Sequence, residues 1–312
     1  MWEEMERDPN VFLLGEDIGA YGGAFKATKG FLERFGEERV IDTPLSEAAI
    51  IGAAVGAAIV GMRPIAEMQF ADFVTCGFNQ LVTNAAKTQY RWNLPVPIVV
   101  RLPAGGYIHG GPYHSASPEG WFFHVPGLKI VAPSTPREAR GLIKAAVRDN
   151  NPVLFLEYKY LYRRIKGDVP DADEVVEIGR GSVKREGGDL TVITYGTTVQ
   201  FALEAAERLA REDGVEARVV DLRTLMPLDT ELIRESASAT GKVLVVHEDH
   251  VTGGVGAEIA ALIADRAFER LDAPVRRIGA LDVPIPFAPP LEEYVLPNTE
   301  KILVGMRDLS RY

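Results

Sequence analysis

The stretch DTPLSEAAIIGAAVGAAIVG, residues 42–61, predicts a buried helix that carries one carboxylate, Glu47, in its first turn. Every residue after Glu47 in this stretch is Ala, Gly, Ile or Val. Removing a carboxylate from water without a partner raises its pKa and costs free energy, so such a group is usually kept because its proton is used. Glu47 is therefore the leading catalytic candidate. The alternative is that Glu47 only occupies a helix N-terminus, which favours acids, and that Ser46 or Thr43 caps the helix.

Short apolar runs bounded by Gly, Pro or Asn alternate with helical stretches along the chain, which is typical of an α/β protein with parallel sheets. In the first half, strands are expected at 11–14, 64–68, 97–102, 129–133 and 152–157, and helices at 46–61, 72–91 and 135–149. In the second half, strands are expected at 190–195, 217–222, 242–248 and 275–279, and a final helix at 299–310. The pattern predicts a domain over 1–157, a charged, Gly-containing linker over 158–188 and a second domain over 189–312.

The composition narrows the function classes. The chain has 312 residues, enough for two domains, and its net charge of −10 argues against binding to nucleic acid or anionic membranes. A lone cysteine, Cys76, excludes an internal disulfide framework and a cysteine-based zinc cluster, and it fits a reducing cytoplasm. The apolar run 48–62 ends at Arg63, short of a membrane-spanning length, and no signal peptide is expected.

Six segments follow one another along the chain: FLLGEDIGAYGGAFKAT (12–28), DTPLSEAAI (42–50), RPIAEMQFADF (63–73), YHSASPEGWFFHVPGLKIVAPSTP (113–136), VRDNNPVLFLE (147–157) and VDLRTLMPLD (220–229). In this order they resemble the β subunit of the first, decarboxylating component of 2-oxo acid dehydrogenase complexes. These are thiamine diphosphate enzymes that act on pyruvate, branched-chain 2-oxo acids and acetoin. The resemblance implies an α/β fold with an N-terminal thiamine-pyrimidine-binding, parallel-sheet domain and a C-terminal transketolase-type α/β domain. It covers nearly the whole chain, although the N-terminus looks abbreviated.

The resemblance assigns four residues to thiamine diphosphate. Glu47 matches the acid that bonds the distal ring nitrogen of the aminopyrimidine, the group that removes the thiazolium proton. Phe73 matches the aromatic residue that stacks on the pyrimidine, Gln69 matches a neighbour in the same pocket, and Glu16 matches an acid near the cofactor. Without the resemblance, Phe73 and Gln69 indicate plain helix packing, and Glu16 indicates a turn residue.

The stretch HGGPYHSASPEGWFFH, residues 109–124, contains three histidines. It offers no cysteine, and its Gly-Gly-Pro interruption spoils helical ligand spacing, so the pattern argues against zinc. By resemblance, His114 lies in the active-site channel and donates a proton to the thiolate that departs when the acyl group reaches the lipoyl disulfide. Read alone, His114 is an ordinary loop histidine. His109 and His124 are weaker candidates for a catalytic role, and His124 is expected at most beside the site.

The chain lacks the Gly-Asp-Gly motif, followed by an Asn, with which thiamine enzymes hold the diphosphate through Mg²⁺. Gly167-Asp168-Val169 and Gly188-Asp189-Leu190 both fail this pattern. By resemblance, the missing half of the site belongs to an α subunit, which holds the Mg²⁺ within an α2β2 heterotetramer. The implied partners also include the lipoyl domain and the peripheral-subunit-binding domain of the acyltransferase component.

The segment VRDNNPV, residues 147–153, matches a monovalent-cation site of the family. A structural K⁺ there would take an all-oxygen shell, which suits a hard cation. The ligands would be the main-chain carbonyls of Ile98, Ala146 and Val147 and the side chains of Asp149 and Asn151. The alternative is an ordinary helix-to-strand turn.

The sequence thus predicts the β subunit of an enzyme that oxidatively decarboxylates a 2-oxo acid and transfers the acyl group to a lipoyl lysine. It leaves the substrate open between pyruvate and branched-chain acids, with acetoin dehydrogenase as the alternative. A nicotinamide-binding oxidoreductase is weaker, because the Gly-rich turn within 243–267 has Ile259 where the third glycine of that motif belongs. A non-catalytic scaffold that docks to the acyltransferase core is a third interpretation, compatible with catalysis.

Overall fold

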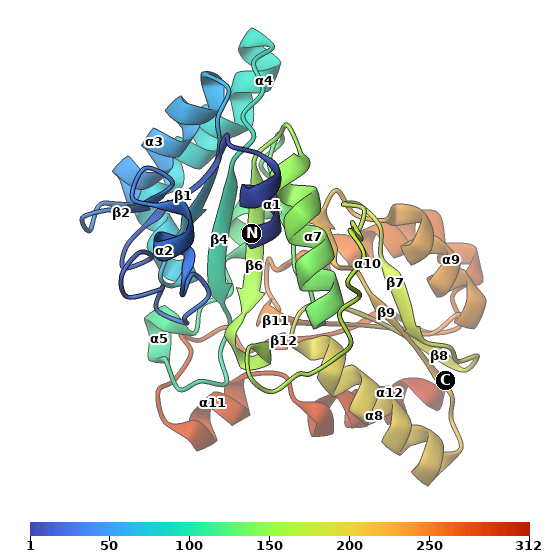
Figure 1. The fold of residues 1–312 in the computed structure, drawn as a ribbon. Coiled ribbons are helices and arrows are strands. Elements are labelled where there is room, and N and C mark those ends of the chain that lie inside the picture. Colours follow the sequence, from blue (N-terminus) through green and yellow to red (C-terminus); the bar gives the residue numbers. More distant parts are fainter.

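The computed structural model describes all residues from 1 to 312, which form two α/β units, each built on one sheet (Figure 1). The first sheet has seven strands in the order β10-β5-β6-β4-β3-β1-β2. All of its pairings are parallel except that of β10 with β5. The strands are β1 (Val11–Gly15), β2 (Val40–Asp42), β3 (Arg63–Glu67), β4 (Val99–Ala104), β5 (Lys129–Val131), β6 (Val153–Tyr158) and β10 (Thr224–Met226).

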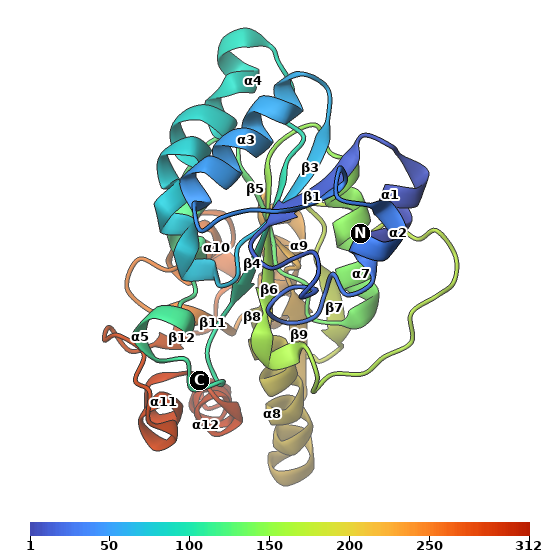
Figure 2. The ribbon, with the colours of Figure 1, turned by 60° about the vertical axis from the view of Figure 1, so that its left-hand side comes forward.

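Helices cover both faces of the first sheet, as Figure 2 shows for α3 on one side and α1 and α7 on the other. Because side chains alternate along a strand, Phe12 and Leu14 of β1 join the hydrophobic core with α3, whereas Val11 and Leu13 join the core with α1 and α7. Burial on both faces explains why the strands read as continuous apolar runs. The helices of this half are α1 (Trp2–Arg7), α2 (Phe31–Phe35), α3 (Glu47–Ile59), α4 (Ala86–Trp92), α5 (Gly111–His114), α6 (Glu119–Phe123) and α7 (Pro136–Arg148).

The single helix expected over 72–91 is wrong. The chain instead forms a 3₁₀ helix at Ala71–Gly77, a π-helical segment at Gln80–Ala85 and then α4, which ends where Asn93 adopts a left-handed conformation. A Cβ at Gly77 would lie 2.2 Å from Cδ1 of Ile51 in α3, so the backbone of this segment packs directly on that helix. This tertiary contact overrides the regular helical winding that the local sequence favours.

The second sheet has the order β12-β11-β8-β9-β7, with β7 antiparallel to β9. Its strands are β7 (Ser182–Arg185), β8 (Leu190–Thr194), β9 (Ala217–Asp221), β11 (Val243–His250) and β12 (Arg276–Ala280). Its helices are α8 (Thr198–Asp213), α9 (Thr230–Thr240), α10 (Val255–Arg266), α11 (Pro289–Val295) and α12 (Thr299–Ser310). Asp229 and Asn298 cap α9 and α12 with side-chain oxygens. None of the helices combines the length and apolar character needed to cross a membrane.

Three short strands were not predicted: β2, which pairs with β1, and also β7 and β10. Strand β7 lies inside the expected linker, where Val183 pairs with Val220 of β9. Strand β10 comes from the second half of the chain but joins the first sheet, where Thr224 pairs with Val131. The two units are therefore connected through a shared strand as well as through side-chain packing, and the exact limits of the linker stay a prediction.

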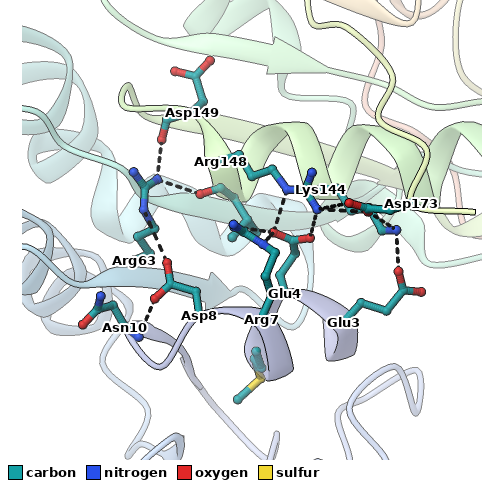
Figure 3. A network of polar contacts seen from close by, with 12 residues as sticks. Glu3, Glu4, Arg7, Asp8, Asn10, Arg63, Lys144, Arg148, Asp149 and Asp173 are labelled. Atoms are coloured by element: carbon teal, nitrogen blue, oxygen red, sulfur yellow. Dashed lines mark hydrogen bonds and ion pairs between the residues drawn. The ribbon is translucent and has the colours of Figure 1, made fainter.

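Helix α1 is fixed to α7 by the ionic network drawn in Figure 3. The fully buried carboxylate of Glu4 accepts hydrogen bonds from Nη2 of Arg148 at 2.7 Å and from Nε of Arg7 at 3.0 Å. Lys144 and Arg148 also pair with Asp173, at 2.8 and 3.0 Å. The network joins α1, α7 and the connecting segment on the face of the first sheet opposite α3.

A buried acid joins the two units at their interface. Glu119 of α6 is 1% exposed, and its Oε1 accepts hydrogen bonds from the hydroxyls of Tyr158 at 2.8 Å and Tyr195 at 3.0 Å. Tyr158 ends β6 in the first sheet, and Tyr195 follows β8 in the second. Burial raises the pKa of Glu119 to about 8, and the nearby charge of Asp249 adds to this shift.

We expect Glu119→Gln to preserve the fold and to flatten the dependence of stability on pH. Because the folded-state pKa lies above the unfolded value, the contribution of Glu119 to the free energy of unfolding is largest at low pH and is lost as the pH rises through about 8. The variant should therefore gain stability relative to the parent between about pH 6 and about pH 9. Urea unfolding at both values measures the difference. Glu177→Gln, at an exposed position, is the control, and a parent-like pH profile in the Glu119 variant would show that Glu119 stays ionised.

Candidate active site

The residues predicted to contact thiamine diphosphate, together with His114, collect at the carboxyl edge of the first sheet. Glu16 follows β1, Gln69 and Phe73 follow β3, His114 lies beyond β4, and Glu47 begins the helix after β2. Ligands of parallel α/β sheets bind at this edge, outside the carboxyl ends of the strands. The fold therefore brings these five residues together from four strand ends, whereas the expected potassium ligands lie before the starts of β4 and β6.

Two carboxylates share the start of α3. Glu16 is 4% exposed, and its Oε1 accepts a hydrogen bond from the Ser46 backbone N–H at 3.3 Å. Its other oxygen, Oε2, is buried without a partner. Burial raises the pKa of Glu16, and the charge of Glu47 raises it further. The shielded acid of this pair is thus Glu16, whereas Glu47 is only partly buried in the isolated chain.

The side-chain cap that belonged to the alternative interpretation of Glu47 is absent from α3. The Ser46 hydroxyl donates to the Pro44 carbonyl at 3.1 Å rather than accepting from the first turn of the helix. The helix N-terminus consequently keeps free N–H groups beside Glu47 and Glu16, and these favour negative charge.

His114 lies in an aromatic and acidic setting. Its Nδ1 is 3.1 Å from Oδ1 of Asp72, and its ring stacks on Phe70 with centroids 4.0 Å apart and planes at 17°. Phe73 meets the same imidazole edge-on at 5.5 Å. A carboxylate that accepts from Nδ1–H fixes the tautomer with Nε2 free to exchange a proton. The structure thus joins His114 to Phe73, and it adds Asp72 and Phe70, which sequence reasoning missed although both belong to the QFADF run.

The remaining candidates lie outside the contacts between His114, Asp72, Phe70 and Phe73. Gln69 donates from Nε2 to Oδ2 of the exposed Asp17 at 2.8 Å, so its amide points along the rim. His109 pairs with the buried Glu292 at 2.8 Å. His124 is exposed. Neither His109 nor His124 takes part in the contacts between His114, Asp72, Phe70 and Phe73.

A polar cavity of about 290 Å³ opens beside Asp72 and extends to the second unit. Its lining includes Ser117 and Glu248. Burial raises the pKa of Glu248 to about 7, and one of its carboxylate oxygens has no hydrogen-bond partner. Lys159 donates to the Pro103 carbonyl at 3.1 Å, and burial lowers its pKa to about 7. Two groups that change charge near neutrality therefore lie close to the start of the His114 loop, and one of them, Glu248, comes from the C-terminal half.

The expected potassium ligands lie close together, but protein cations already contact them. Arg63 donates from Nη1 to the Val147 carbonyl at 2.8 Å and to the Asp149 carbonyl at 3.0 Å (Figure 3). Lys129 pairs with the Asp149 carboxylate, which also accepts from the Asn151 backbone N–H at 2.8 Å. The Ile98 carbonyl accepts from Val153 N–H at 2.9 Å, and the Ala146 carbonyl accepts from Asp149 N–H at 3.3 Å. This donor set does not fit a potassium ion as it stands, and the K⁺ site stays a prediction.

The Gly-rich turn before α10 serves internal packing. A Cβ at Gly254 would lie 2.7 Å from Cε1 of His247, and a Cβ at Gly256 would lie 2.4 Å from its Nε2. The glycines accommodate this buried imidazole, whose pKa burial lowers to about 4. The turn therefore offers no open cradle for a dinucleotide, which weakens the nicotinamide interpretation.

Comparison with known families agrees with this geometry. Residues 1–164 match the transketolase pyrimidine binding domain, and residues 179–302 match the transketolase C-terminal domain. A solved structure described as a split gene transketolase, inactive beta4 tetramer, superposes with a TM-score of 0.81 at 26% identity, covering 99% of this chain and 94% of that one. The fold and the edge site define a transketolase-type subunit of a thiamine-dependent enzyme.

Relatives that align over nearly the whole chain identify the family within the thiamine-dependent enzymes. The chain is 57% identical to the 2-oxoisovalerate dehydrogenase subunit beta of Bacillus subtilis, covering 100% of this chain and 96% of the relative. It is 44% identical to the mitochondrial 2-oxoisovalerate dehydrogenase subunit beta 2 of Arabidopsis thaliana, with coverage of 99% and 86%. It is also 44% identical to the pyruvate dehydrogenase E1 component subunit beta of B. subtilis, with coverage of 99% and 95%. The chain belongs to the β subunits of the E1 components of 2-oxo acid dehydrogenases, which are thiamine diphosphate-dependent enzymes.

Proposed function

We propose that this chain forms one half of an active site that oxidatively decarboxylates a branched-chain 2-oxo acid or pyruvate and passes the acyl group to a lipoyl group. The convergence of the Glu16–Glu47 pair with the His114–Asp72 pair at one sheet edge carries the proposal. The names of the relatives favour a branched-chain substrate, because 2-oxoisovalerate dehydrogenase appears at 57% identity and pyruvate dehydrogenase at 44%.

The residues at this edge fit the pyrimidine end of thiamine diphosphate. Glu16 has a buried oxygen without a partner, Glu47 starts α3 beside it, and Phe73 presents an aromatic ring next to His114. When bound, the cofactor supplies the nucleophilic carbon that attacks a 2-oxo acid. We assign the pyrimidine contacts to Glu47 and Phe73, with Gln69 and Glu16 around them. The chain has no Gly-Asp-Gly motif, so the diphosphate and its Mg²⁺ are assigned to the α subunit.

Each acid or base in the site has a distinct task. The Glu47 carboxyl is assigned to hold the proton at the distal nitrogen of the pyrimidine, with Glu16 beside it. His114 donates a proton from Nε2 to the sulfur that leaves the lipoyl disulfide. Asp72 orients the imidazole through Nδ1, and Phe70 fixes the plane of the ring. The two pairs thus serve successive steps of one reaction.

The proposed assembly is an α2β2 heterotetramer that also binds the lipoyl and peripheral-subunit-binding domains of the acyltransferase. The exposed face of α3 supports a protein partner, because it presents Ala49, Ala53 and Gly56 and carries no charged residue. A Cβ at Gly56 would meet no atom within 4 Å, so this face leaves room for a close neighbour. A cytoplasmic location belongs to the same proposal, and the free, exposed thiol of Cys76 is consistent with a reducing compartment.

The direct test is reconstitution with the cognate α subunit, thiamine diphosphate and Mg²⁺. We expect the isolated chain to bind the cofactor weakly and to lack decarboxylase activity, and the reconstituted tetramer to oxidise 2-oxoisovalerate faster than pyruvate, 2-oxobutyrate or acetoin. Calorimetry on the isolated chain and a rate panel on the tetramer measure both. Tight, Mg²⁺-dependent binding without an α subunit would contradict the shared site, and a preference for acetoin would favour the alternative enzyme.

Replacing Glu47 tests its role in the first step. Glu47→Gln keeps nearly the same shape but cannot exchange the proton, so decarboxylation by the tetramer should fall by about 10²–10⁴-fold, as expected for a positioned acid–base group. Single-turnover assays with a soluble electron acceptor avoid the lipoyl step. Glu33→Gln, on α2, is the matched control. Near-normal turnover in the Glu47 variant would leave Glu47 as an acid that only favours the helix N-terminus.

Replacing His114 should separate the two half-reactions. In His114→Ala, acylation of a free lipoyl domain should fall at least about tenfold further than turnover with an artificial acceptor, because only acylation needs a proton for sulfur. The exposed His124→Ala is the control. Equal losses in both assays would instead assign His114 to positioning the cofactor or substrate.

A further inference from the structure

The loop that carries His114 has an unfavourable backbone. Between the end of β4 and α5, φ is +84° at Gly105, +60° at Tyr107, +59° at His109 and +71° at Gly111. Glycine adopts such left-handed conformations readily, but Tyr and His do not, and residues held there persist only where the surroundings impose them. The backbone at Tyr107 and His109 therefore needs a specific external constraint.

That constraint comes from the other half of the chain. Glu292 of α11 is 2% exposed, and its carboxylate accepts hydrogen bonds from Tyr107 N–H at 3.0 Å and His109 N–H at 3.3 Å. These are the backbone N–H groups of the two left-handed residues that are not glycine. The same carboxylate contacts Nδ1 of His109 at 2.8 Å and accepts from the Ser115 hydroxyl at 3.3 Å. Both oxygens are thus fully engaged by the loop.

A carboxylate suits this position better than an amide, because it offers two acceptor oxygens and no N–H group. Each of its two oxygens faces two donors from the loop. Hydrogen bonds to an ionised acceptor are stronger than neutral ones, and an unmatched buried donor is costly. A glutamine would present one oxygen and one NH₂ group, and the NH₂ group would point at N–H donors. The site therefore discriminates between acid and amide at nearly constant shape.

We propose that Glu292 is a positioning residue, which holds Tyr107 and His109 in their left-handed conformations and thereby places His114 against Asp72 and Phe70. Ser115, the residue after His114, is the last point of attachment. The C-terminal half of the chain thus takes part in the site through the shape of a loop. The structural claim concerns the loop alone, and only its catalytic consequence rests on the proposed function of His114.

The primary test is amide hydrogen exchange on the full chain, alone and in the tetramer with its α subunit. In Glu292→Gln, peptides that cover residues 105–115 should exchange at least about tenfold faster than in the parent, because two amide hydrogen bonds are lost. The adjacent, exposed Glu293→Gln should leave that exchange unchanged. If Glu292→Gln does not fold, Glu292→Asp, which keeps the charge on a shorter side chain, should give a smaller acceleration. Parent-like exchange in a folded Glu292 variant overturns the proposal.

A second readout distinguishes positioning from general destabilisation. Glu292→Gln should slow acylation of a lipoyl domain more than turnover with an artificial acceptor, and it should add no further loss in a His114→Ala background, because coupled residues are not additive. Faster exchange without this selective loss, in an enzyme where His114→Ala does show it, overturns the positioning of His114 by Glu292. If His114→Ala itself shows no selective loss, the proposed function of His114 fails, and hydrogen exchange alone then decides the role of Glu292 in the loop.

Discussion

The faces of a parallel sheet that is covered on both sides are mostly apolar, so a ligand meets the polar side chains where the strands end. In this chain that constraint gathers Glu16 after β1, Gln69 after β3 and the His114 loop after β4 at one edge. Helix α3 starts at the same edge because it follows β2, so its only carboxylate, Glu47, lies beside Glu16. The place of the site is thus determined by the burial of the sheet, and the individual side chains decide only its chemistry.

Buried carboxylates at the interface between the two halves complete this edge. Glu119 connects tyrosines from the two sheets, Glu248 accepts from the Gly106 N–H, and Glu292 accepts from the two residues that follow in left-handed conformation. A buried carboxylate is costly unless its donors are correctly placed, so such contacts favour one relative arrangement of the two halves over others. Their contribution is therefore to specificity of geometry more than to stability. The loop that carries His114 inherits its geometry from this interface.

Local pattern was enough to predict most strands and α3, and the family resemblance supplied the candidate site residues, whose place at one sheet edge only the fold reveals. It failed where distant contacts decide: Gly77 packs on Ile51 and breaks the expected helix over 72–91, and β10 joins a sheet whose other strands end at Tyr158. Asp72 was visible in the QFADF run, but its contact with His114 spans 42 positions. Glu292 lies 177 positions from Ser115, and no periodicity in the sequence connects them. Local sequence also could not predict that Glu16 is more buried than Glu47, because tertiary packing decides the burial of both carboxylates.

The two ends of thiamine diphosphate make different physical demands, which explains why one chain can supply only half of the proposed site. The pyrimidine needs an aromatic surface and a shielded acid. The edge around Glu16 and Phe73 offers both, because burial raises the pKa of the Glu16 carboxyl. The diphosphate needs a hard cation held by oxygen ligands, for which this sequence has no motif. Under the proposed assembly, a partner that carries the cation site also covers α3 and shields Glu47 from water. Formation of the tetramer would therefore supply both the cation site at the diphosphate end and the exclusion of water at the acid end.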